Sequence, residues 1–554
     1  MKRKNLKTMA VAMATMMLAS SALAGCGGTT PASNETQKST TAQSAQTTAG
    51  AQGETETAGN ESWVSDEPIE ITIMMSDNAN QPLKNDAPAH EEIFKKTNVD
   101  INIEIVPNSS YSDKKSIVLG TNNFPDMIYI GTEDLVTYST EGIFEPLMQY
   151  VNEETMPNFY KFWQQYPDMK KYLVDGELYA FPVVARNEAA NGYGPVIRTD
   201  LLEKHNIPLP QTWDELLEAL TQLKKEYPDS TPWTGRKGTK RLFESTAYML
   251  GSGYGMYYDF DEGKYMFGPA DDNFKAVLDY LNRAYEAGVL DPEYQTTTAE
   301  TLESKMCSGQ SFFFCDNSGF GQNYTVSLQK VAGCENAELQ ILEIPENSFG
   351  QSRAITYQTI LPGRMYALNA DAENKEEIIK FIDWMYSQEG SDISNYGVEG
   401  YSFEYDENGE PQFIEEYAMQ FKDAQPAGYY GVYTDLGITK LDWSLWACNT
   451  ETQFKLQKIH GVWGDLVDEY WNIVNNDKAY HAPMMDPSFT AEEAERIQDI
   501  SVELNTMLEQ EYDKYIMGKE DISNWDSIIA KCEEMGVREL EQIYNDAQAR
   551  AEAQ

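Results

Sequence analysis

Aromatic residues with a polar edge are the most distinctive chemical feature of this 554-residue sequence, which holds 34 Tyr and 10 Trp but only 4 His. Several of them crowd into turn-rich stretches, namely GSGYGMYYD (251–259), AGYYGVY (427–433) and DWSLW (442–446). Such rings offer a flat apolar face and a hydrogen-bonding edge, and loops of this composition make a poor core but a good binding surface. Core packing is the alternative for each ring. The candidates for stacking on a ligand are Trp233, Tyr254, Tyr257, Trp443 and Trp446, with Trp443 or Trp446 expected opposite Tyr254.

Polar side chains follow three predicted strands at the point where each strand ends. Asp77 and Asn78 follow the strand at 69–75, and Glu133 follows the short strand at 126–130. Asp316 and Asn317 follow the Phe-rich strand at 311–314. Ligands of open α/β sheets bind beyond the carboxyl ends of the strands, so these side chains are expected to face a cleft. Turn formation and helix capping are the alternative roles for such residues.

Catalytic signatures are missing from the sequence. It contains no GxSxG elbow, no HExxH and no phosphate-binding loop with its lysine. Paired carboxylates carry no weight in a chain with 89 Asp and Glu. Residues 259–263 and 406–409 read as hairpin turns, and a structural calcium ion bound by their carboxylates is an alternative. We therefore expect neither a catalytic residue nor a cofactor.

The start of the chain predicts a lipid anchor. A basic head of Lys2, Arg3, Lys4 and Lys7 precedes a short apolar run, which is the layout of a secretory signal and is too short for a membrane span. The run ends in LAGC (23–26), which resembles the bacterial lipobox, where cleavage leaves a cysteine whose sulfur carries a diacylglycerol. Residues 1–25 are thus expected to be a signal peptide, Cys26 the lipidated residue, and 26–66 a disordered tether of small polar residues. The protein is then expected on the outer face of the bacterial cell membrane.

Composition limits what the remaining residues can be. About 490 of them follow the tether, which is too many for one hydrophobic core and suits two or more domains. The formal charge of −47 argues against a nucleic acid partner, because phosphate backbones require a basic surface. Five further cysteines are scattered without a CxxC pair and are expected to be small core residues.

Alternating and helical patterns predict a mixed α/β protein with more than one sheet. Strands are expected at 69–75, 99–106 and 126–130, with helices near 88–96 and 112–119 between them. Strand–helix–strand order of this kind gives right-handed βαβ units on a largely parallel sheet. Further helices are expected after the capping box Thr212–Glu215, from Phe274 to Gly288, and around 378–385.

An ordered set of phrases across the chain resembles a known family. The phrases are FPDMIYI (124–130), VDGELYAFPVV (174–184), VIRTDLLEKHNIPLPQTWDELLEAL (196–220), YLNRAYEAGVLDPE (280–293), NYGVEGYSFEYDENGEPQF (395–413) and GKEDISNWDSIIAKCEEMGVRELEQIYNDA (518–547). They are similar to those of extracellular solute-binding lipoproteins of ABC importers, in the long-chain branch of family 1 that is related to maltose-binding protein. The resemblance implies a type II periplasmic-binding-protein fold, with two discontinuous α/β lobes, a hinge, and a sugar in the cleft that is delivered to membrane permeases by a monomer.

Three crossings between the lobes are expected. The polar stretch between Arg186 and Arg198 suits the first, residues 351–358 the second, and residues 423–430 the third. Lobe 1 would then comprise 67–186 and about 355–422, and lobe 2 about 187–354 and 423–554. Glu188 and Tyr193 lie beside the first crossing, and the family's version of 395–403 borders the cleft. Cleft contacts are therefore also expected from Glu188, Tyr193, Tyr396 and Glu399.

The acidic surplus favours a neutral oligosaccharide as the ligand, because rim carboxylates accept hydrogen bonds from hydroxyls and repel an acidic sugar. A peptide or another polar solute is an alternative ligand. A surface-anchored glycan-active enzyme is the alternative from another functional class.

Overall fold

The computed structural model describes residues 64–186, 193–356, 359–424, 427–438, 444–461, 473 and 479–553. The expected signal peptide, Cys26 and nearly all of the expected tether lie outside these residues. The tether prediction extends slightly too far, because Val64 and Ser65 are already buried and the Ser65 amide donates to the Thr97 carbonyl at 3.3 Å. None of the helices in the described part of the chain has both the length and the apolar character that a membrane span needs.

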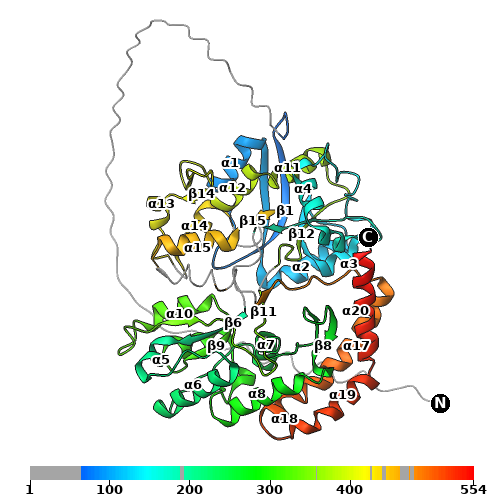
Figure 1. Cartoon of the computed structure of the whole chain (residues 1–554). Helices are drawn as coiled ribbons and strands as arrows, with labels where there is room; N and C mark the ends of the chain where they lie inside the picture. Colours follow the sequence, from blue (N-terminus) through cyan, green and yellow to red (C-terminus); the bar gives the residue numbers. More distant parts are fainter. Residues whose placement is uncertain are drawn as a thin grey trace, which may run out of the picture. The chain divides into compact units, whose positions relative to one another are not determined.

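The first lobe, which carries the labels β1 and β12 in Figure 1, is built on a five-stranded sheet with the strand order β2-β1-β3-β12-β4. β1 pairs in parallel with β2 and β3, as the βαβ pattern predicts, whereas β12 is antiparallel to β3 and β4. The strands of this lobe are β1 (Ile69–Asp77), β2 (Val99–Pro107), β3 (Met127–Gly131), β4 (Phe181–Pro182), β5 (Val184–Ala185), β12 (Arg364–Leu368), β13 (Phe403–Tyr405), β14 (Pro411–Phe413) and β15 (Trp446–Ala447). Its helices are α1 (Pro88–Thr97), α2 (Asn108–Gly120), α3 (Thr132–Tyr138), α4 (Pro157–Gln165), α11 (Lys375–Met385), α12 (Gln388–Tyr396), α13 (Glu415–Met419), α14 (Gly428–Leu436) and α15 (Asn449–Ile459).

The second lobe has a smaller antiparallel sheet, β10-β6-β9, and a separate hairpin of β7 and β8. Its strands are β6 (Tyr193–Arg198), β7 (Met256–Asp259), β8 (Lys264–Phe267), β9 (Phe313–Asn317), β10 (Leu339–Ile341), β11 (Ala354–Ile355) and β16 (Tyr480–His481). Its helices are α5 (Thr199–His205), α6 (Trp213–Glu226), α7 (Gly238–Thr246), α8 (Phe274–Glu286), α9 (Ala299–Cys307), α10 (Phe320–Leu328), α17 (Ala491–Glu509), α18 (Tyr512–Ile516), α19 (Trp525–Glu534) and α20 (Val537–Glu552).

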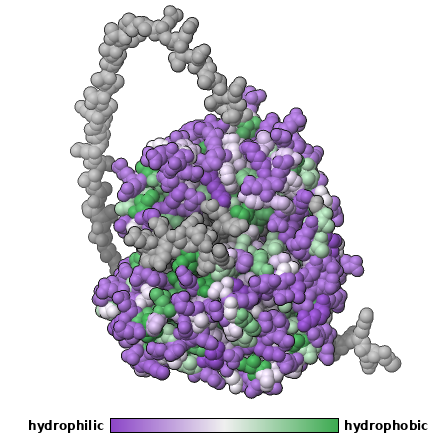
Figure 2. All heavy atoms as spheres, viewed as in Figure 1, coloured by the Kyte–Doolittle hydropathy of each residue, from purple (hydrophilic) through white to green (hydrophobic). Residues whose placement is uncertain are grey.

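Local sequence signals set the ends of several of these helices. The Thr212 hydroxyl accepts a hydrogen bond from the Glu215 amide at 3.1 Å, so the expected cap starts α6. α8 presents buried Val277, Leu278 and Leu281 to the core, and Gly288 follows it with a φ of 67°. The face shown in Figure 2 is mostly hydrophilic, in keeping with the strongly acidic composition.

Separate hydrophobic cores define the two lobes. One core draws its buried residues from 64–184 and 361–456, and the other draws them from 197–354 and 479–540. A small third cluster, within 196–339, lies around α9 and α10 in the second lobe. Discontinuous lobes of this kind require the chain to pass between them more than once.

The cores also locate the crossings. The chain passes from the first core to the second between Ala185 and Val196, and returns between Ala354 and Leu361. The sequence predicted crossings between Arg186 and Arg198 and at 351–358, which overlap these intervals. The third crossing predicted at 423–430 is wrong. AGYYGVY forms α14, whose apolar face packs into the core of lobe 1, and α15 follows in the same core. The chain joins the second core again only at Ala479.

Candidate ligand-binding site

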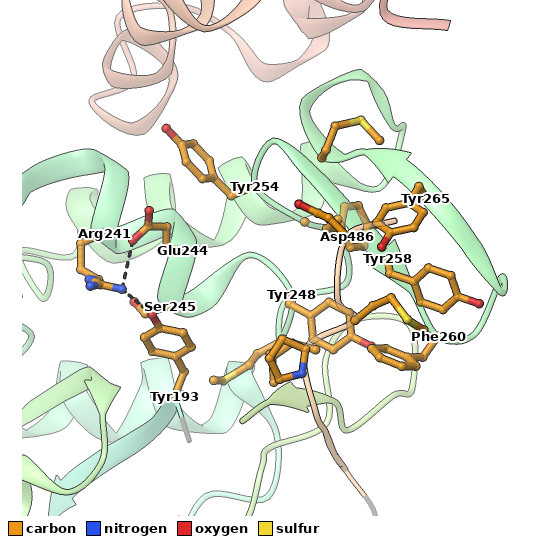
Figure 3. Close-up of a pocket in the computed structure, with 17 residues that line it drawn as sticks. Tyr193, Arg241, Glu244, Ser245, Tyr248, Tyr254, Tyr258, Phe260, Tyr265 and Asp486 are labelled. Carbon is orange, nitrogen blue, oxygen red and sulfur yellow. Dashed lines mark hydrogen bonds and ion pairs between the residues drawn. The ribbon is translucent and has the colours of Figure 1, made fainter. Parts of the chain in front are cut away.

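A cavity of about 520 Å³ opens in lobe 2, which is within the range of roughly 300 to 1,000 Å³ that is typical of ligand sites. Its lining includes Tyr193 at the first connection between the lobes and Ile355 at the second, together with Pro483 and Met484, which follow the return of the chain to the second core at Ala479. The other lining residues are Arg241, Glu244, Ser245, Tyr248, Met249, Gly253, Tyr254, Met256, Tyr257, Tyr258, Phe260, Tyr265 and Asp486 (Figure 3).

One side of the cavity is an aromatic wall, defined here as Tyr248, Tyr257, Tyr258, Phe260 and Tyr265. The β7–β8 hairpin places Tyr258 opposite Tyr265 in the cross-strand register, with ring centroids 5.2 Å apart and planes at 78°. Phe260 packs against Tyr258 in the same edge-to-face manner at 5.1 Å. The turn-rich composition of 251–259 has a steric reason as well: a Cβ at Gly253 would meet the Tyr257 ring at 2.0 Å. Glycine at 253 therefore lets the Tyr257 ring lie flat along this loop.

The opposite side is polar and comes mainly from α7 (Figure 3). The Arg241 guanidinium pairs with Glu244 at 3.0 Å, donates to the Tyr193 hydroxyl and lies 5.4 Å from the centre of the Tyr193 ring. Asp316 lies 3.8 Å behind it and is itself held in a two-bonded pair with Arg236, at 2.9 Å for each bond. Arg241 and Glu244 thus present a fixed cation and a fixed carboxylate side by side, one turn apart on one helix.

Burial sets the protonation of the tyrosines. It raises the pKa of Tyr248 and that of Tyr254 to about 12, and it raises the pKa of Tyr257 and that of Tyr265 further still. Their hydroxyls therefore remain neutral donors and acceptors near pH 7. The Asp486 side chain keeps an exposed surface in the cavity. Desolvation by the surrounding protein atoms raises the pKa of its carboxyl, and the nearby positive charge of Lys171 opposes this rise.

The arrangement suits recognition of a polar ligand with apolar faces. Aromatic rings cover one side, a donor–acceptor pair covers the other, and the buried Nε of Arg241 has no hydrogen-bond partner among the residues that the structure describes. In the described ranges, no group of three or more His, Cys, Asp or Glu side chains is placed to hold a metal ion. The Asp259 side chain, in one of the two hairpins considered for calcium, instead pairs with Arg353 at 3.0 Å.

Three of the expected contact residues line the cavity: Tyr193, Tyr254 and Tyr257. Asp316 lies behind it, with its carboxylate taken by two arginines. Asp77 accepts a hydrogen bond from the Leu83 amide, Asn78 from the Asn80 amide and Asn317 from the Gly319 amide. These bonds fit the alternative role of such side chains, which is to stabilise the loop that follows each strand. Glu133 and Glu399 are exposed at a helix start and in a loop outside the cavity. Glu188, Trp443 and Cys26 lie outside the described residues.

Two of the aromatic predictions are wrong. Trp233 is 1% exposed and packs edge-on against Phe313 in the core of lobe 2, because its short segment bridges to Leu290 and Phe313 as a strand would. Tyr396 is fully buried in lobe 1, where its hydroxyl lies 3.2 Å from Glu451. Neither ring can stack on a ligand in this conformation. Trp446 is half-buried, against Phe162 and Arg186, and does not line the described cavity.

Sequence reasoning missed most of the polar side and four of the five residues of the aromatic wall, of which only Tyr257 was expected. Tyr258 stands beside the predicted Tyr257 in a stretch that was singled out, so the dense tyrosine pattern could have included it. Arg241 and Glu244 carry no such signal, because i,i+3 ion pairs occur on ordinary exposed helices. Asp486 lies in the segment that follows the third connection, more than two hundred residues farther along the chain.

Comparison with known proteins gives a consistent result. The family model described as bacterial extracellular solute-binding protein matches residues 78–392. The chain is 22% identical to the polygalacturonan/rhamnogalacturonan-binding protein YtcQ of Bacillus subtilis (strain 168), over 83% of this chain and 87% of YtcQ. It is 23% identical to the fructooligosaccharide ABC transporter substrate-binding protein FusA of Streptococcus pneumoniae, over 53% of this chain and 56% of FusA.

Solved structures show the same fold. The alginate-binding protein AlgQ2 superposes with a TM-score of 0.67 at 21% identity, over 88% of this chain and 99% of AlgQ2. A solute-binding protein from Bifidobacterium longum infantis, associated with a transporter that binds HMO, superposes with a TM-score of 0.66 at 15% identity, over 87% and 98% of the two chains. The two-lobe architecture with separate cores is thus shared with these proteins.

Proposed function

Because this chain belongs to the family of bacterial extracellular solute-binding proteins, we propose that it is the substrate-binding component of an ABC importer that captures an oligosaccharide outside the cell. Its fold is the two-lobe, type II solute-binding fold. The names of its relatives support a carbohydrate ligand, since YtcQ, FusA and AlgQ2 are each described by a saccharide that they bind. In this role the protein delivers its ligand to membrane permeases and works as a monomer.

The cavity beside the three connections is the observation that carries the proposal. A pyranose ring has an apolar face of C–H groups and a rim of hydroxyls, so it is bound by aromatic plates and a few fixed polar groups. The half-buried rings of the aromatic wall, Tyr257, Tyr258 and Phe260, supply the plates. Arg241 with Glu244 supplies a donor and an acceptor for neighbouring hydroxyls.

The charges around the cavity favour a neutral sugar. Arg241 is the cation among the described lining residues, and its charge is already balanced by Glu244 and, from behind, by Asp316. Asp486 adds a further carboxylate, and the neutral tyrosines add no positive charge. A uronate would meet this acidic surrounding without a free cation to pair with it, although YtcQ and AlgQ2 are named for acidic polysaccharides.

Titration calorimetry of residues 64–554 against a panel of neutral and acidic oligosaccharides tests the proposal. We expect a neutral oligosaccharide to bind with measurable heat and to be recovered intact from the same sample. Binding of peptides but no saccharide would contradict the proposal. Glu244 and Asp486 in one cavity also suit a glycan-active enzyme, and cleaved product in the recovered ligand would favour that second function.

Anchoring by Cys26 is part of the proposal, since a transporter component must stay near its permeases. LAGC after a basic and apolar leader supports a lipid on this cysteine. In Cys26→Ala we expect the protein to leave the membrane fraction or to remain unprocessed. Fractionation and migration identical to the parent protein would contradict lipidation at this residue.

A further inference from the structure

Arg353 lies behind the aromatic wall, directly before β11 and the second crossing. Its side chain is 5% exposed. Its Nε donates to the Tyr248 carbonyl at 2.8 Å, and its guanidinium lies over the Tyr248 ring at 4.1 Å. Its Nη1 donates to Asp259 at 3.0 Å and to Asp261 at 3.1 Å. One guanidinium therefore contacts the backbone, the ring and two carboxylates around a single wall.

These contacts reach two separate pieces of the chain that form the wall. Tyr248 follows α7, whereas Asp259 closes β7 and accepts a hydrogen bond from the Tyr257 hydroxyl at 3.1 Å. Asp259 also accepts from the amides of Asp261 and Glu262, which fixes the hairpin turn. A guanidinium holds such partners with its planar fork, which an ammonium group cannot reproduce.

The same residue borders the second crossing. Ala354 packs in the core of lobe 2 and Ile355 lines the cavity, whereas Leu361 is already in the core of lobe 1. A buried ion pair thus joins the aromatic wall to the segment that connects the two lobes.

We propose that Arg353 is a positioning residue, which holds Tyr248 and Tyr257 in place for the ligand and couples the filled cavity to the second crossing. The inference rests on the proposed function only in taking the occupant to be a saccharide. Arg353 does not line the cavity, so it acts through the wall and makes no contact with the ligand.

A buried ion pair could instead serve stability alone, and paired variants separate the two roles. Arg353→Met leaves the buried Asp259 carboxylate without a cation to balance its charge, which is strongly destabilising. Arg353→Met combined with Asp259→Asn removes that unpaired charge and should regain most of the lost stability. Arg353→Lys keeps the charge but loses the fork. Arg496→Met, which breaks an exposed pair with Glu539 on lobe 2, is the matched control.

The first measurement is affinity, by calorimetry with the saccharide that the parent protein binds best. We expect at least tenfold weaker binding in the double variant and in Arg353→Lys, although both are folded by circular dichroism, and binding within threefold of the parent in Arg496→Met. If the double variant binds within threefold of the parent, the positioning role is wrong and Arg353 serves stability alone. If the parent binds no saccharide at all, the proposed function fails and this measurement is replaced by the next.

The second measurement needs no ligand. In hydrogen exchange of the unliganded proteins, we expect faster exchange across 248–261 and 353–356 in the double variant, with the rest of lobe 2 unchanged. Exchange equal to that of the parent across these segments would overturn the inference. With a saccharide at saturation, small-angle scattering adds a further readout: the parent should become more compact, and the double variant should compact less.

Discussion

Two aromatic groups of lobe 2 differ in how completely the protein covers them. The Trp233 cluster, defined as Trp213, Trp233, Tyr280 and Phe313, is buried on every side, with each member at most 3% exposed. In the aromatic wall of the cavity, Tyr248 and Tyr265 are also buried, but Tyr257, Tyr258 and Phe260 are only half-buried. Both groups pack edge-to-face with similar ring distances, 5.3 Å for Trp233 and Phe313 and 5.2 Å for Tyr258 and Tyr265.

The backbone around each group explains the difference. Trp233 lies between Leu290 and Phe313 in strand-like bridges, so it is flanked on both sides. Tyr258 lies on a two-stranded hairpin beside which the described part of the chain places no further strand, and its ring is only half-buried. A ring in the middle of a layer stabilises the fold, and a ring on an isolated hairpin keeps a face available to a ligand. The comparison can be tested by truncating one ring of each group.

Trp233→Ala should give the largest effect, and this effect should be on stability. Removing a fully buried Trp typically costs about 3–5 kcal/mol in the free energy of unfolding, through lost burial and the cavity left behind. Urea unfolding monitored by circular dichroism measures this cost. A variant that unfolds at the same urea concentration as the parent would show that the cluster is not a core.

Tyr258→Ala should reduce ligand affinity rather than stability. Truncating an aromatic hot spot costs about 2 kcal/mol or more, which is roughly thirtyfold in the dissociation constant. Calorimetry with the best saccharide measures it. Tyr285→Ala is the matched control, because Tyr285 is a half-buried tyrosine on α8 of the same lobe that does not line the cavity. Equal affinities in the two variants would mean that the aromatic wall is not the binding surface.

The smallest effect is an acid dependence of the aromatic wall. Burial alone would raise the pKa of Asp259, but Arg353 and the Glu262 amide outweigh it, so the pKa lies below its ordinary value of 3.8. A carboxylate with a lowered pKa stabilises the folded state fully above its unfolded pKa, and this contribution is lost as the pH falls through the folded pKa. We therefore expect the β7–β8 hairpin to loosen below about pH 4 in the parent protein.

Hydrogen exchange of 256–267 between pH 5 and 3, corrected for the intrinsic rate, measures the loosening. Asp259→Asn cannot titrate at this position and should lose the acid-dependent step. The same step in the variant would assign it to another carboxyl group.

The sequence indicated the fold where local patterns and tertiary packing agree. Alternation in 69–75 and 99–106 predicted β1 and β2 because one face of each strand is buried, and the cap at Thr212 fixes where α6 begins. The third crossing is misplaced because the composition of AGYYGVY is typical of a loop, whereas Tyr429, Val432 and Tyr433 form a buried face of α14. Glycines in that segment allow close packing: a Cβ at Gly431 would meet Ala424 at 2.8 Å.

The sequence by itself determined the acidic character, the N-terminal leader with its LAGC end, and the helices and strands with strong periodicity. Only the tertiary structure decided which aromatic rings keep an uncovered face. Trp233 and Tyr258 both stand in short turn-rich stretches, and the difference between them comes from strands and helices distant in sequence. Burial depends on how many neighbours cover a side chain, and those neighbours are brought together by folding rather than by the local sequence.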